Sequence, residues 1–364
     1  MRLKLGGCRY MGNMSWINVW LSGLLFLLIQ AAAPAFASPA PPSLPPEDVG
    51  EWQNEATIPL PGKTTRFDYE SLDPETGRLF IAHTGDGTLA VVDAVGRKVI
   101  ANLSGFPEVR GVLAIPALQR VYATVSPSPG KIGGILVVVD IRTLKTIGTI
   151  PVGVHPDGLD YEAQTGRIFV SNEWGKSLSV VDAKTEKVIA TIPLRGVAGN
   201  PRTDSVTHRI YVTVQTRNLL VRVDPYSLHV VRRYRLPCRR PHGLWIDGPS
   251  SLAYVACEGD HRLLVVDLLS GKIRSSLPTG RRPDILSFDF SRGLLFVASG
   301  SGFVDVYRKT GKELVPISTK SFLGFRAHSI LVDPSTHLLF LPLENDEGHA
   351  VLRILSWKDV RTEK

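Results

Sequence analysis

The sequence contains Ala56-Thr57-Ile58-Pro59-Leu60-Pro61-Gly62 near its N-terminus, and Ala190-Thr191-Ile192-Pro193-Leu194-Arg195-Gly196 nearly restates this segment in mid-chain. The mid-chain copy closes a complete sequence repeat. The last repeat, around Phe340, stops near Ser356 without such a closing segment. A repeat that begins at one end of the chain and finishes at the other predicts a closed ring, in which the N-terminal segment completes the last unit.

An aromatic residue marks each repeat and stands in a short apolar run, as in Arg167-Ile-Phe-Val-Ser171 and Arg209-Ile-Tyr-Val-Thr213. Successive aromatic anchors are 42 to 47 residues apart. A period of this length, with four short strands in each period, is typical of a β-propeller blade. Helical patterns are almost absent, so the sequence predicts an all-β, seven-bladed β-propeller. The anchors are Phe80, Tyr122, Phe169, Tyr211, Tyr254, Phe296 and Phe340.

The fourth strand of each repeat is predicted to be the outermost one. Pro59 and Pro193 both lie in this strand, and proline lacks the N–H donor that a central strand needs. The N-terminal segment is therefore expected to pair beside Val351 to Ser356 in the last blade. This pairing covers a sheet edge that an open ring would expose.

The repeats resemble the YVTN-type (YncE-like) seven-bladed β-propeller family. The matching pieces are Arg209-Ile-Tyr-Val-Thr213, Arg167-Ile-Phe-Val-Ser-Asn172, Pro156-Asp-Gly-Leu159 and the Leu-x-Val-Val-Asp runs ending at Asp93, Asp182 and Asp267. The resemblance covers about residues 55 to 356 and implies the fold. It says little about function, because most such proteins have no assigned activity. The related lactonase-like propellers show that the fold can host hydrolysis.

The first 37 residues have the order of a secretory signal peptide. Arg2, Lys4 and Arg9 precede an apolar run, and Ala35-Phe36-Ala37 is a small-residue cleavage pattern. Cleavage after Ala37 predicts a periplasmic or secreted protein without stable membrane insertion, and the alternative is an uncleaved anchor. Residues 38–50 are predicted to be a Pro-rich spacer, 51–357 the propeller and 358–364 a charged tail. Cleavage lowers the formal charge from +8 to +5.

The cysteines and the repeated aspartates both favour structural roles. Cys8 leaves with the signal peptide, while Cys238 and Cys257 flank neighbouring strands of one repeat and are predicted to form a disulfide after export. A metal pair is disfavoured, since no CxxC spacing supports it. An aspartate that ends the third strand of a repeat, as Asp182 does, precedes a tight turn and is expected to cap it. The series is Asp93, Asp140, Asp182, Asp224 and Asp267.

Alignment of the repeats on their aromatic anchors shows two columns of ionisable residues. Twelve residues before the anchor stand Asp68, Arg110, Asp157, Gly199, His242, Asp284 and His328. Two residues earlier stand Arg66, Glu108, His155, Val197, Arg240, Arg282 and Arg326. The fourth repeat breaks both columns, unless it is shortened by three residues so that Arg202 replaces Gly199. These positions begin the innermost strands, so the side chains should meet at one mouth of the central channel.

We expect a charged ligand or partner site at this mouth and no catalysis, since a concave site with converging charges is the default place for binding. The candidate ligand-binding residues are Arg66, Asp68, Arg110, His155, Asp157, Arg240, His242, Arg282, Asp284, Arg326 and His328. Ends of second strands add His83, Asn172, Glu173, Glu258, His261 and Glu344. The row of arginines favours a small anionic ligand.

Several alternatives remain open. The charged ring can be purely structural, with its members paired among themselves. No cofactor is firmly implied, but Asp68, His242, Asp284 and His328 can hold a divalent metal, and the protein would then be a hydrolase or lyase. A third alternative is a protein-interaction scaffold with an exposed apolar patch. Nucleic-acid binding is disfavoured, because the basic run from Arg232 to Arg240 falls mostly on an outer strand. The protein is expected to be a monomer.

Overall fold

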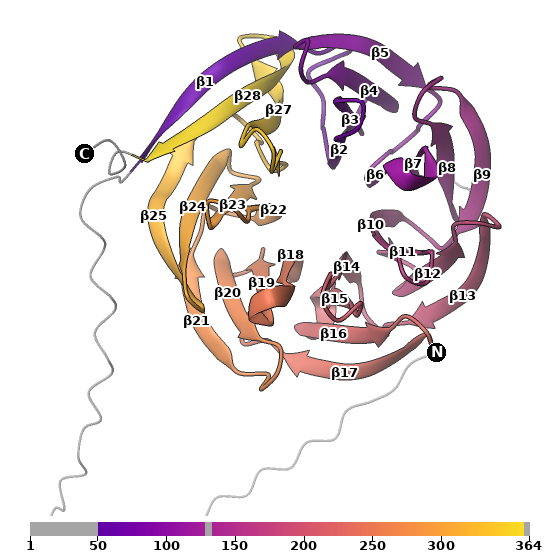
Figure 1. The fold of residues 1–364 in the computed structure, drawn as a ribbon, viewed down its shortest axis with the longest axis vertical. Coiled ribbons are helices and arrows are strands. Elements are labelled where there is room, and N and C mark those ends of the chain that lie inside the picture. The colour runs from indigo at the N-terminus through magenta and orange to yellow at the C-terminus, as the bar shows by residue number, and fades with distance from the viewer. Residues whose placement is uncertain (1–49, 128–132, 360–364) are drawn as a thin grey trace, which may run out of the picture. The chain divides into compact units, whose positions relative to one another are not determined.

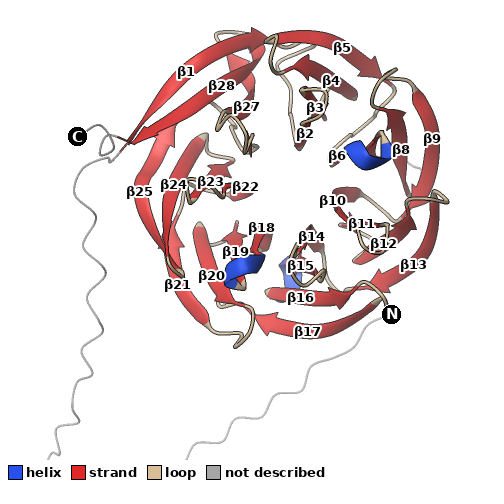
Figure 2. Ribbon diagram, in the orientation of Figure 1, coloured by secondary structure: helices blue, strands red, loops and turns tan. Residues whose placement is uncertain are grey.

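The computed structural model describes residues 50–127 and 133–359, which form seven four-stranded antiparallel sheets arranged as blades around an axis (Figure 1). The only helices in this part of the chain are three single 3-10 turns, η1 (Pro116–Leu118), η2 (Gln215–Arg217) and η3 (Gly248–Ser250) (Figure 2). The prediction of an all-β, seven-bladed β-propeller is therefore confirmed. None of the described helices is long and apolar enough to cross a membrane.

The strands of each blade follow the chain from the axis outward. Blade one holds β2 (Glu70–Asp73), β3 (Arg78–His83), β4 (Thr88–Asp93) and β5 (Lys98–Ser104). Blade two holds β6 (Val112–Ile115), β7 (Arg120–Val125), β8 (Gly134–Asp140) and β9 (Thr146–Val152). Blade three holds β10 (Pro156–Glu162), β11 (Arg167–Asn172), β12 (Ser177–Asp182) and β13 (Lys187–Pro193). Blade four holds β14 (Ala198–Thr203), β15 (Ile210–Val214), β16 (Leu219–Asp224) and β17 (His229–Arg235).

The remaining blades continue this order, except that the last one takes its outermost strand from the N-terminus. Blade five holds β18 (Pro241–Asp247), β19 (Leu252–Cys257), β20 (Arg262–Asp267) and β21 (Ile273–Pro278). Blade six holds β22 (Pro283–Asp289), β23 (Leu294–Ser299), β24 (Phe303–Thr310) and β25 (Glu313–Phe322). Blade seven holds β26 (Leu331–Val332), β27 (Leu339–Asp346), β28 (His349–Asp359) and β1 (Gly50–Pro59).

The ring closes as the repeat pattern predicts. Strand β1 pairs antiparallel with β28, with Ile58 opposite Leu352 and Pro59 opposite Val351, and the two strands lie side by side in Figure 1. Strand β28 extends to Asp359, two residues beyond the end expected for the propeller. The expected signal peptide and nearly all of the expected spacer lie outside the described residues.

The seven aromatic anchors lie in the core between blades. All are at most 2% exposed, because each stands on the second strand, which has sheet neighbours on both sides and a blade packed on each face. Trp52 of β1 adds to the seam between blades six and seven, where its ring centroid lies 5.8 Å from that of Phe296 and 5.1 Å from that of Trp357. The closing strand thus supplies core packing as well as backbone pairing.

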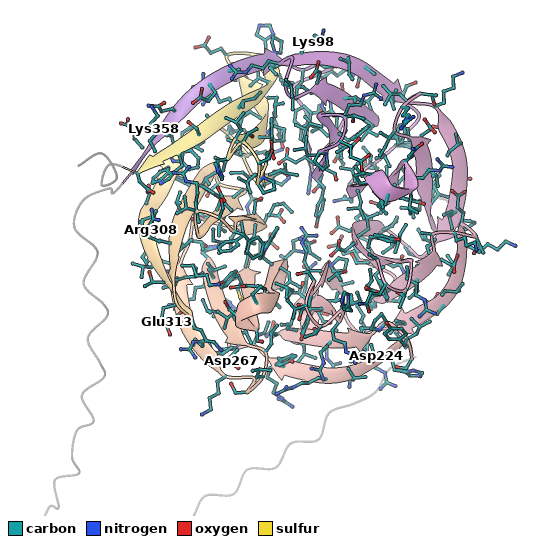
Figure 3. All side chains as sticks on the ribbon, in the orientation of Figure 1. Lys98, Asp224, Asp267, Arg308, Glu313 and Lys358 are labelled. Atoms are coloured by element: carbon teal, nitrogen blue, oxygen red, sulfur yellow. A yellow bond between two sulfur atoms is a disulfide. The ribbon has the colours of Figure 1, made fainter. Side chains whose placement is uncertain are left out.

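The turn aspartates cap turns, as expected. Asp182 Oδ1 accepts the backbone N–H groups of Lys184 (3.1 Å) and Thr185 (2.7 Å). Asp224 and Asp267 make the same contacts in their own turns and lie at the outer rim of the ring (Figure 3). These residues are therefore remote from the axis.

The predicted disulfide is present in blade five. Cys238 and Cys257 are bonded, with their Cα atoms 6.1 Å apart, and both side chains are buried in the core of this blade. The bond is compatible with an oxidising compartment. In the basic run that follows blade four's third strand, Arg233 and Arg235 are exposed on β17, the outermost strand of its blade.

Candidate functional site

A cavity of about 330 Å³ lies at the axis, at the end where the innermost strands begin. All seven blades contribute to its wall, and the wall is made almost wholly of ionisable side chains. The fifteen lining residues are Arg66, Asp68, Arg110, Asp157, Glu173, Gln215, Arg240, His242, Glu258, Arg282, Asp284, Gly300, Arg326, His328 and Glu344.

In blades five, six and seven the backbone brings three positions together at the wall. In blade five, Arg240 has a left-handed backbone (φ 52°) and its carbonyl accepts the N–H of Glu258 at 3.0 Å, while His242 follows on β18. Blade six repeats this arrangement, because the carbonyl of Arg282 accepts the N–H of Gly300 at 2.8 Å. A non-glycine residue with a left-handed backbone lowers the free energy of unfolding by roughly 1 to 2 kcal/mol. The left-handed residues in this column are Glu108, His155, Arg240, Arg282 and Arg326.

Glycines after the inner residues let adjacent blades approach each other at the axis. A Cβ atom on Gly243 would lie 1.7 Å from the carbonyl oxygen of Asp284 in the next blade, and one on Gly111 would lie 2.3 Å from that of Asp157. Only glycine fits such contacts. The close approach draws the charged side chains of neighbouring blades into one small cavity.

The structure brings ten of the eleven predicted site residues to this cavity. The exception is His155. Its ring stacks on Trp174 at 3.8 Å, and its Nδ1 lies 3.0 Å from Glu173 Oε2. His155 therefore contacts a residue of the wall without lining the cavity itself. Blade four is not shortened, because Arg202 pairs with Tyr211 as Asp160 pairs with Phe169. Arg202 therefore does not replace Gly199. The role of the ten residues in binding stays a prediction.

The ends of the second strands divide into two groups. Glu173, Glu258 and Glu344 line the cavity, as predicted. The other three have local partners instead: His83 stacks on Phe67, Asn172 accepts the N–H of Gly153, and His261 accepts the N–H of Arg282. Sequence reasoning missed Gln215 and Gly300. Both stand four residues after their anchor, as the three glutamates do, so a third column would have found them.

Four of the five arginines at the wall have a carboxylate partner. Arg66 lies 2.8 Å from Asp68, which raises the pKa of the guanidinium, and Arg110 lies 3.8 Å from the same carboxylate. Two further pairs each join residues of one blade. They are Arg240–Glu258 at 3.0 Å and Arg326–Glu344 at 3.2 Å.

Arg282 differs from these four. No carboxylate of residues 50–127 or 133–359 lies within 4.0 Å of its guanidinium, which donates to the carbonyl of Gly300 at 3.2 Å. Gly300 occupies the position that Glu258 and Glu344 hold in the flanking blades. Blade six thus presents an arginine that no carboxylate of the described residues pairs at this distance.

In the neighbouring blade five, His242 lies close to two carboxylates. Its Nε2 is 3.3 Å from Asp284 Oδ1 and 3.9 Å from Asp157 Oδ2. Asp157 belongs to blade three, so His242 must reach across blade four. Gly199, which breaks the column of charges, presents no side chain between them. The gap in the sequence pattern is therefore what allows the two ionisable groups to meet.

This cluster shifts the ionisation of its members. Burial first, and then the nearby charges of Asp68 and Glu173, raise the pKa of Asp157 to about 6 against the lowering effect of His242. Burial alone would lower the pKa of His242, but Asp284, Asp157 and Glu173 raise it. For Glu173, burial is outweighed by His155 and His242, which lower its pKa to about 2.

Gln215 ties the protonation of His242 to hydrogen bonding. Its Nε2 lies 3.1 Å from the carbonyl oxygen of Ala198, 3.2 Å from Glu173 Oε1 and 2.9 Å from His242 Nδ1. The amide nitrogen carries two hydrogens, so it can donate to only two of these three acceptors at a time. When His242 Nδ1 carries a proton it cannot accept from Gln215, and the two hydrogens are then left to Ala198 and Glu173.

Two nitrogens at the wall have no hydrogen-bond partner within the described part of the chain: Arg110 Nε and His328 Nε2. His328 Nδ1 donates to the carbonyl of Arg326 at 2.9 Å, so its Nε2 is free to accept. Below the wall, the Tyr69 hydroxyl donates to Asn200 Oδ1, which joins blade one to blade four across the axis. Burial first, and then Asp157, Asp284 and Asp68, raise the pKa of Tyr69.

The four weak candidates for a metal do not form a set of ligands. Within residues 50–127 and 133–359 no three His, Cys, Asp or Glu side chains are grouped to hold a metal ion. Asp68 faces two arginines, and His328 uses one ring nitrogen on a carbonyl. These donors are directed toward protein partners rather than toward a common centre.

Comparison with known proteins supports the fold only. A chain of Kuenenia stuttgartiensis hydrazine synthase is similar, with a TM-score of 0.65 and 17% sequence identity over 81% of this chain and 96% of that chain. No protein-family model matches the sequence. No curated protein matches it either. At this identity the shared feature is the propeller architecture.

Proposed function

We propose that this propeller is a non-catalytic binding protein that holds a small anionic ligand at the charged mouth. The observation that carries the proposal is Arg282, the arginine at the wall that has no carboxylate of the described residues within 4.0 Å of its guanidinium. An anion placed against a guanidinium gains charge-assisted hydrogen bonds, which are among the stronger polar contacts in proteins. A cavity of about 330 Å³ suits a small molecule.

The neighbouring blade adds a second guanidinium to the same cavity. Arg326 is half exposed, but it is paired with Glu344 at 3.2 Å. Arg282 is therefore the arginine through which an anion can be held with the least competition from the protein.

Isothermal titration calorimetry with succinate and with inorganic phosphate tests the proposal. We expect binding to the native protein, and a loss of about tenfold or more in affinity in Arg282→Gln, since one charge-assisted hydrogen bond is removed. Arg233→Gln is the matched control, because this arginine is exposed on the outer strand β17. Equal affinities in the native protein and in Arg282→Gln would contradict the proposed anchor.

A second candidate function is acid–base catalysis in a hydrolase or lyase. It is favoured by the contact of His242 with Asp157 and Asp284, in which burial raises the pKa of Asp157 to about 6, close to the range where a general base works best. Screening the protein against a panel of lactones and simple esters tests this. Turnover that disappears in both Asp157→Asn and His242→Gln would support catalysis, and its persistence in both variants would exclude this cluster.

A scaffold role has weaker support. Trp174 is 62% exposed beside His155, and Phe325, which is 59% exposed, packs against the Arg326 guanidinium at 5.3 Å. These aromatic side chains lie near the mouth but belong to blades three and seven. They do not form the single broad apolar patch that a protein partner needs.

We further propose that the chain is an exported monomer of the YVTN type. The basic start, the apolar run and the Ala35-Phe36-Ala37 pattern support export, and the disulfide is compatible with it. N-terminal sequencing of protein from the host should begin at Ser38. Full-length protein in the membrane fraction would indicate an anchor instead.

A further inference from the structure

The carboxylates of the cavity are distributed unevenly, which bears on the kind of anion that fits there. Asp68, Glu258 and Glu344 each pair with an arginine. Asp157, Glu173 and Asp284 have no arginine within 4.0 Å in the described residues, and their nearest charged neighbours are histidines. The mouth therefore contains three carboxylates without a permanent counter-ion and one such arginine, Arg282.

These two kinds of unmatched charge are adjacent. Arg282 and Asp284 are separated only by Pro283, and both line the same cavity. Asp157 and Asp284 both lie close to His242 Nε2, at 3.9 Å and 3.3 Å. The unpaired carboxylates and the unpaired guanidinium of Arg282 thus line the same small cavity, where one small molecule can contact both.

Burying these carboxylates in their ionised form costs free energy unless a cation lies beside them. Asp157 is 4% exposed, and a buried carboxylate is stable only when opposite charge or donors face it. The raised pKa of Asp157 reflects that shortage, since Asp68 and Glu173 act in the same direction as burial. A protonated His242 offsets a single charge. Two of these carboxylates also act on the buried Tyr69 hydroxyl, whose pKa is raised by burial first and then by Asp157, Asp284 and Asp68.

We infer that the ligand is a small zwitterion, with its anionic group on Arg282 and a cationic ammonium group among Asp157, Glu173 and Asp284. This inference rests on the proposed function and restricts it, because a simple dianion would place its second negative group beside three carboxylates. An ammonium group satisfies them with three N–H donors. A molecule of amino-acid size fits the cavity.

A four-carbon series of probes tests this inference by calorimetry at pH 7.5. The series is 2-aminobutyrate, 4-aminobutyrate, succinate and putrescine, which differ mainly in the charges they carry and in the spacing of these charges. We expect at least one aminobutyrate to bind about tenfold or more tightly than succinate and putrescine. Binding should weaken below pH 6, because protonated Asp157 no longer attracts an ammonium group.

Two variants separate the poles of the site. Asp157→Asn should weaken aminobutyrate about tenfold or more and leave succinate unchanged or tighter, while Arg282→Gln should weaken both and spare putrescine. Glu313→Gln is the matched control, because this residue lies at the outer rim on β25 (Figure 3). Melting curves establish that each variant is folded.

The outcomes distinguish the inference from the proposed function. Succinate binding as tightly as both aminobutyrates, with a loss in Arg282→Gln, would overturn the zwitterion and retain the anion site. Aminobutyrate binding that Asp157→Asn leaves unchanged would do the same. Binding of no probe, or binding that Arg282→Gln does not affect, would overturn the anion site and the zwitterion with it.

Discussion

Blades five and six place different residues at the same three positions. Blade five has Arg240, His242 and Glu258, and blade six has Arg282, Asp284 and Gly300. The backbone contacts are alike, because the carbonyl of each arginine accepts the N–H of the third residue, at 3.0 Å and 2.8 Å respectively. The side chains differ in outcome: Arg240 is neutralised by Glu258, and Arg282 has no such partner. One glutamate-to-glycine difference therefore separates an arginine held in an ion pair from one without such a partner.

The largest expected effect is the loss of stability when the ring that contains both blades is opened. Deleting residues 50–59 removes β1 and the packing of Trp52 against Phe296, and exposes the edge of β28. We expect loss of cooperative unfolding or aggregation, measured by thermal melting and light scattering. A melting profile that matches the intact protein would contradict this role of the closing strand.

The disulfide is a feature of blade five that blade six lacks, since Gly280 and Ser299 stand at its equivalent positions. Replacing Cys238 and Cys257 with Ala should lower stability by about 3 kcal/mol, because the bond closes a short loop in the unfolded chain. Chemical denaturation with and without reductant measures this. The double variant should also be insensitive to reductant, and native oxidised protein should have no titratable thiol.

The pH dependence of stability tests the surroundings of Asp157, the carboxylate beside the inner residue His242 of blade five. The pKa of Asp157, beside His242, is raised to about 6, so the folded protein holds this proton more tightly than the unfolded chain does. The associated stability is present below about pH 4 and is lost as the pH rises through 6.

Asp157→Asn should therefore stabilise the protein relative to the native sequence above pH 6, by at most about 2 to 3 kcal/mol. The difference should shrink toward pH 4, where the carboxyl is protonated in both states. Urea denaturation from pH 4 to pH 8 measures the difference between the two proteins. A difference that is constant over this range would mean that Asp157 does not titrate as described.

Gly300→Glu converts blade six to the pattern of blade five. A Cβ at Gly300 would make only van der Waals contacts, at 3.4 Å or more, with Arg282, so the substitution fits the backbone. The new carboxylate should pair with Arg282 and weaken binding of the anionic probe about tenfold, as measured by calorimetry. Gly300→Gln, which adds similar bulk without charge, is the control and should bind more tightly than Gly300→Glu.

The reverse change is expected to have the smallest effect. Glu258→Gln removes the partner of Arg240 and should strengthen binding of succinate by a few-fold, since Arg240 is more than half exposed and its charge is screened by water. Weaker succinate binding in this variant would show that Glu258 positions Arg240 for the anion rather than competing with it.

The sequence pattern predicts the fold in detail because each repeat carries its own aromatic anchor and five of the seven carry a turn aspartate. Ring closure follows from one displaced segment, Ala56 to Gly62, and the disulfide from two cysteines at neighbouring strand ends. These features are local to a blade, and antiparallel pairing converts sequence offsets directly into positions.

The candidate site is only partly predictable in the same way. Columns of aligned residues identify which side chains reach the mouth, and ten of eleven lie there. They do not show which charges meet, because the pairs form between columns and between blades. The row of arginines indicated an anion site as a whole, whereas three of four arginines in that row are compensated by Asp68, Glu258 and Glu344. The contact of His242 with Asp157 depends on the absent side chain of Gly199.

The hydrogen bond between Tyr69 and Asn200 also has a mechanical consequence. Each blade packs on the next one around the ring. A ring held only by such contacts can flatten toward an ellipse while every contact between neighbouring blades stays intact. A hydrogen bond that spans the axis from blade one to blade four opposes this deformation. The shape of the ring is therefore also supported from within, by two buried residues that do not line the cavity.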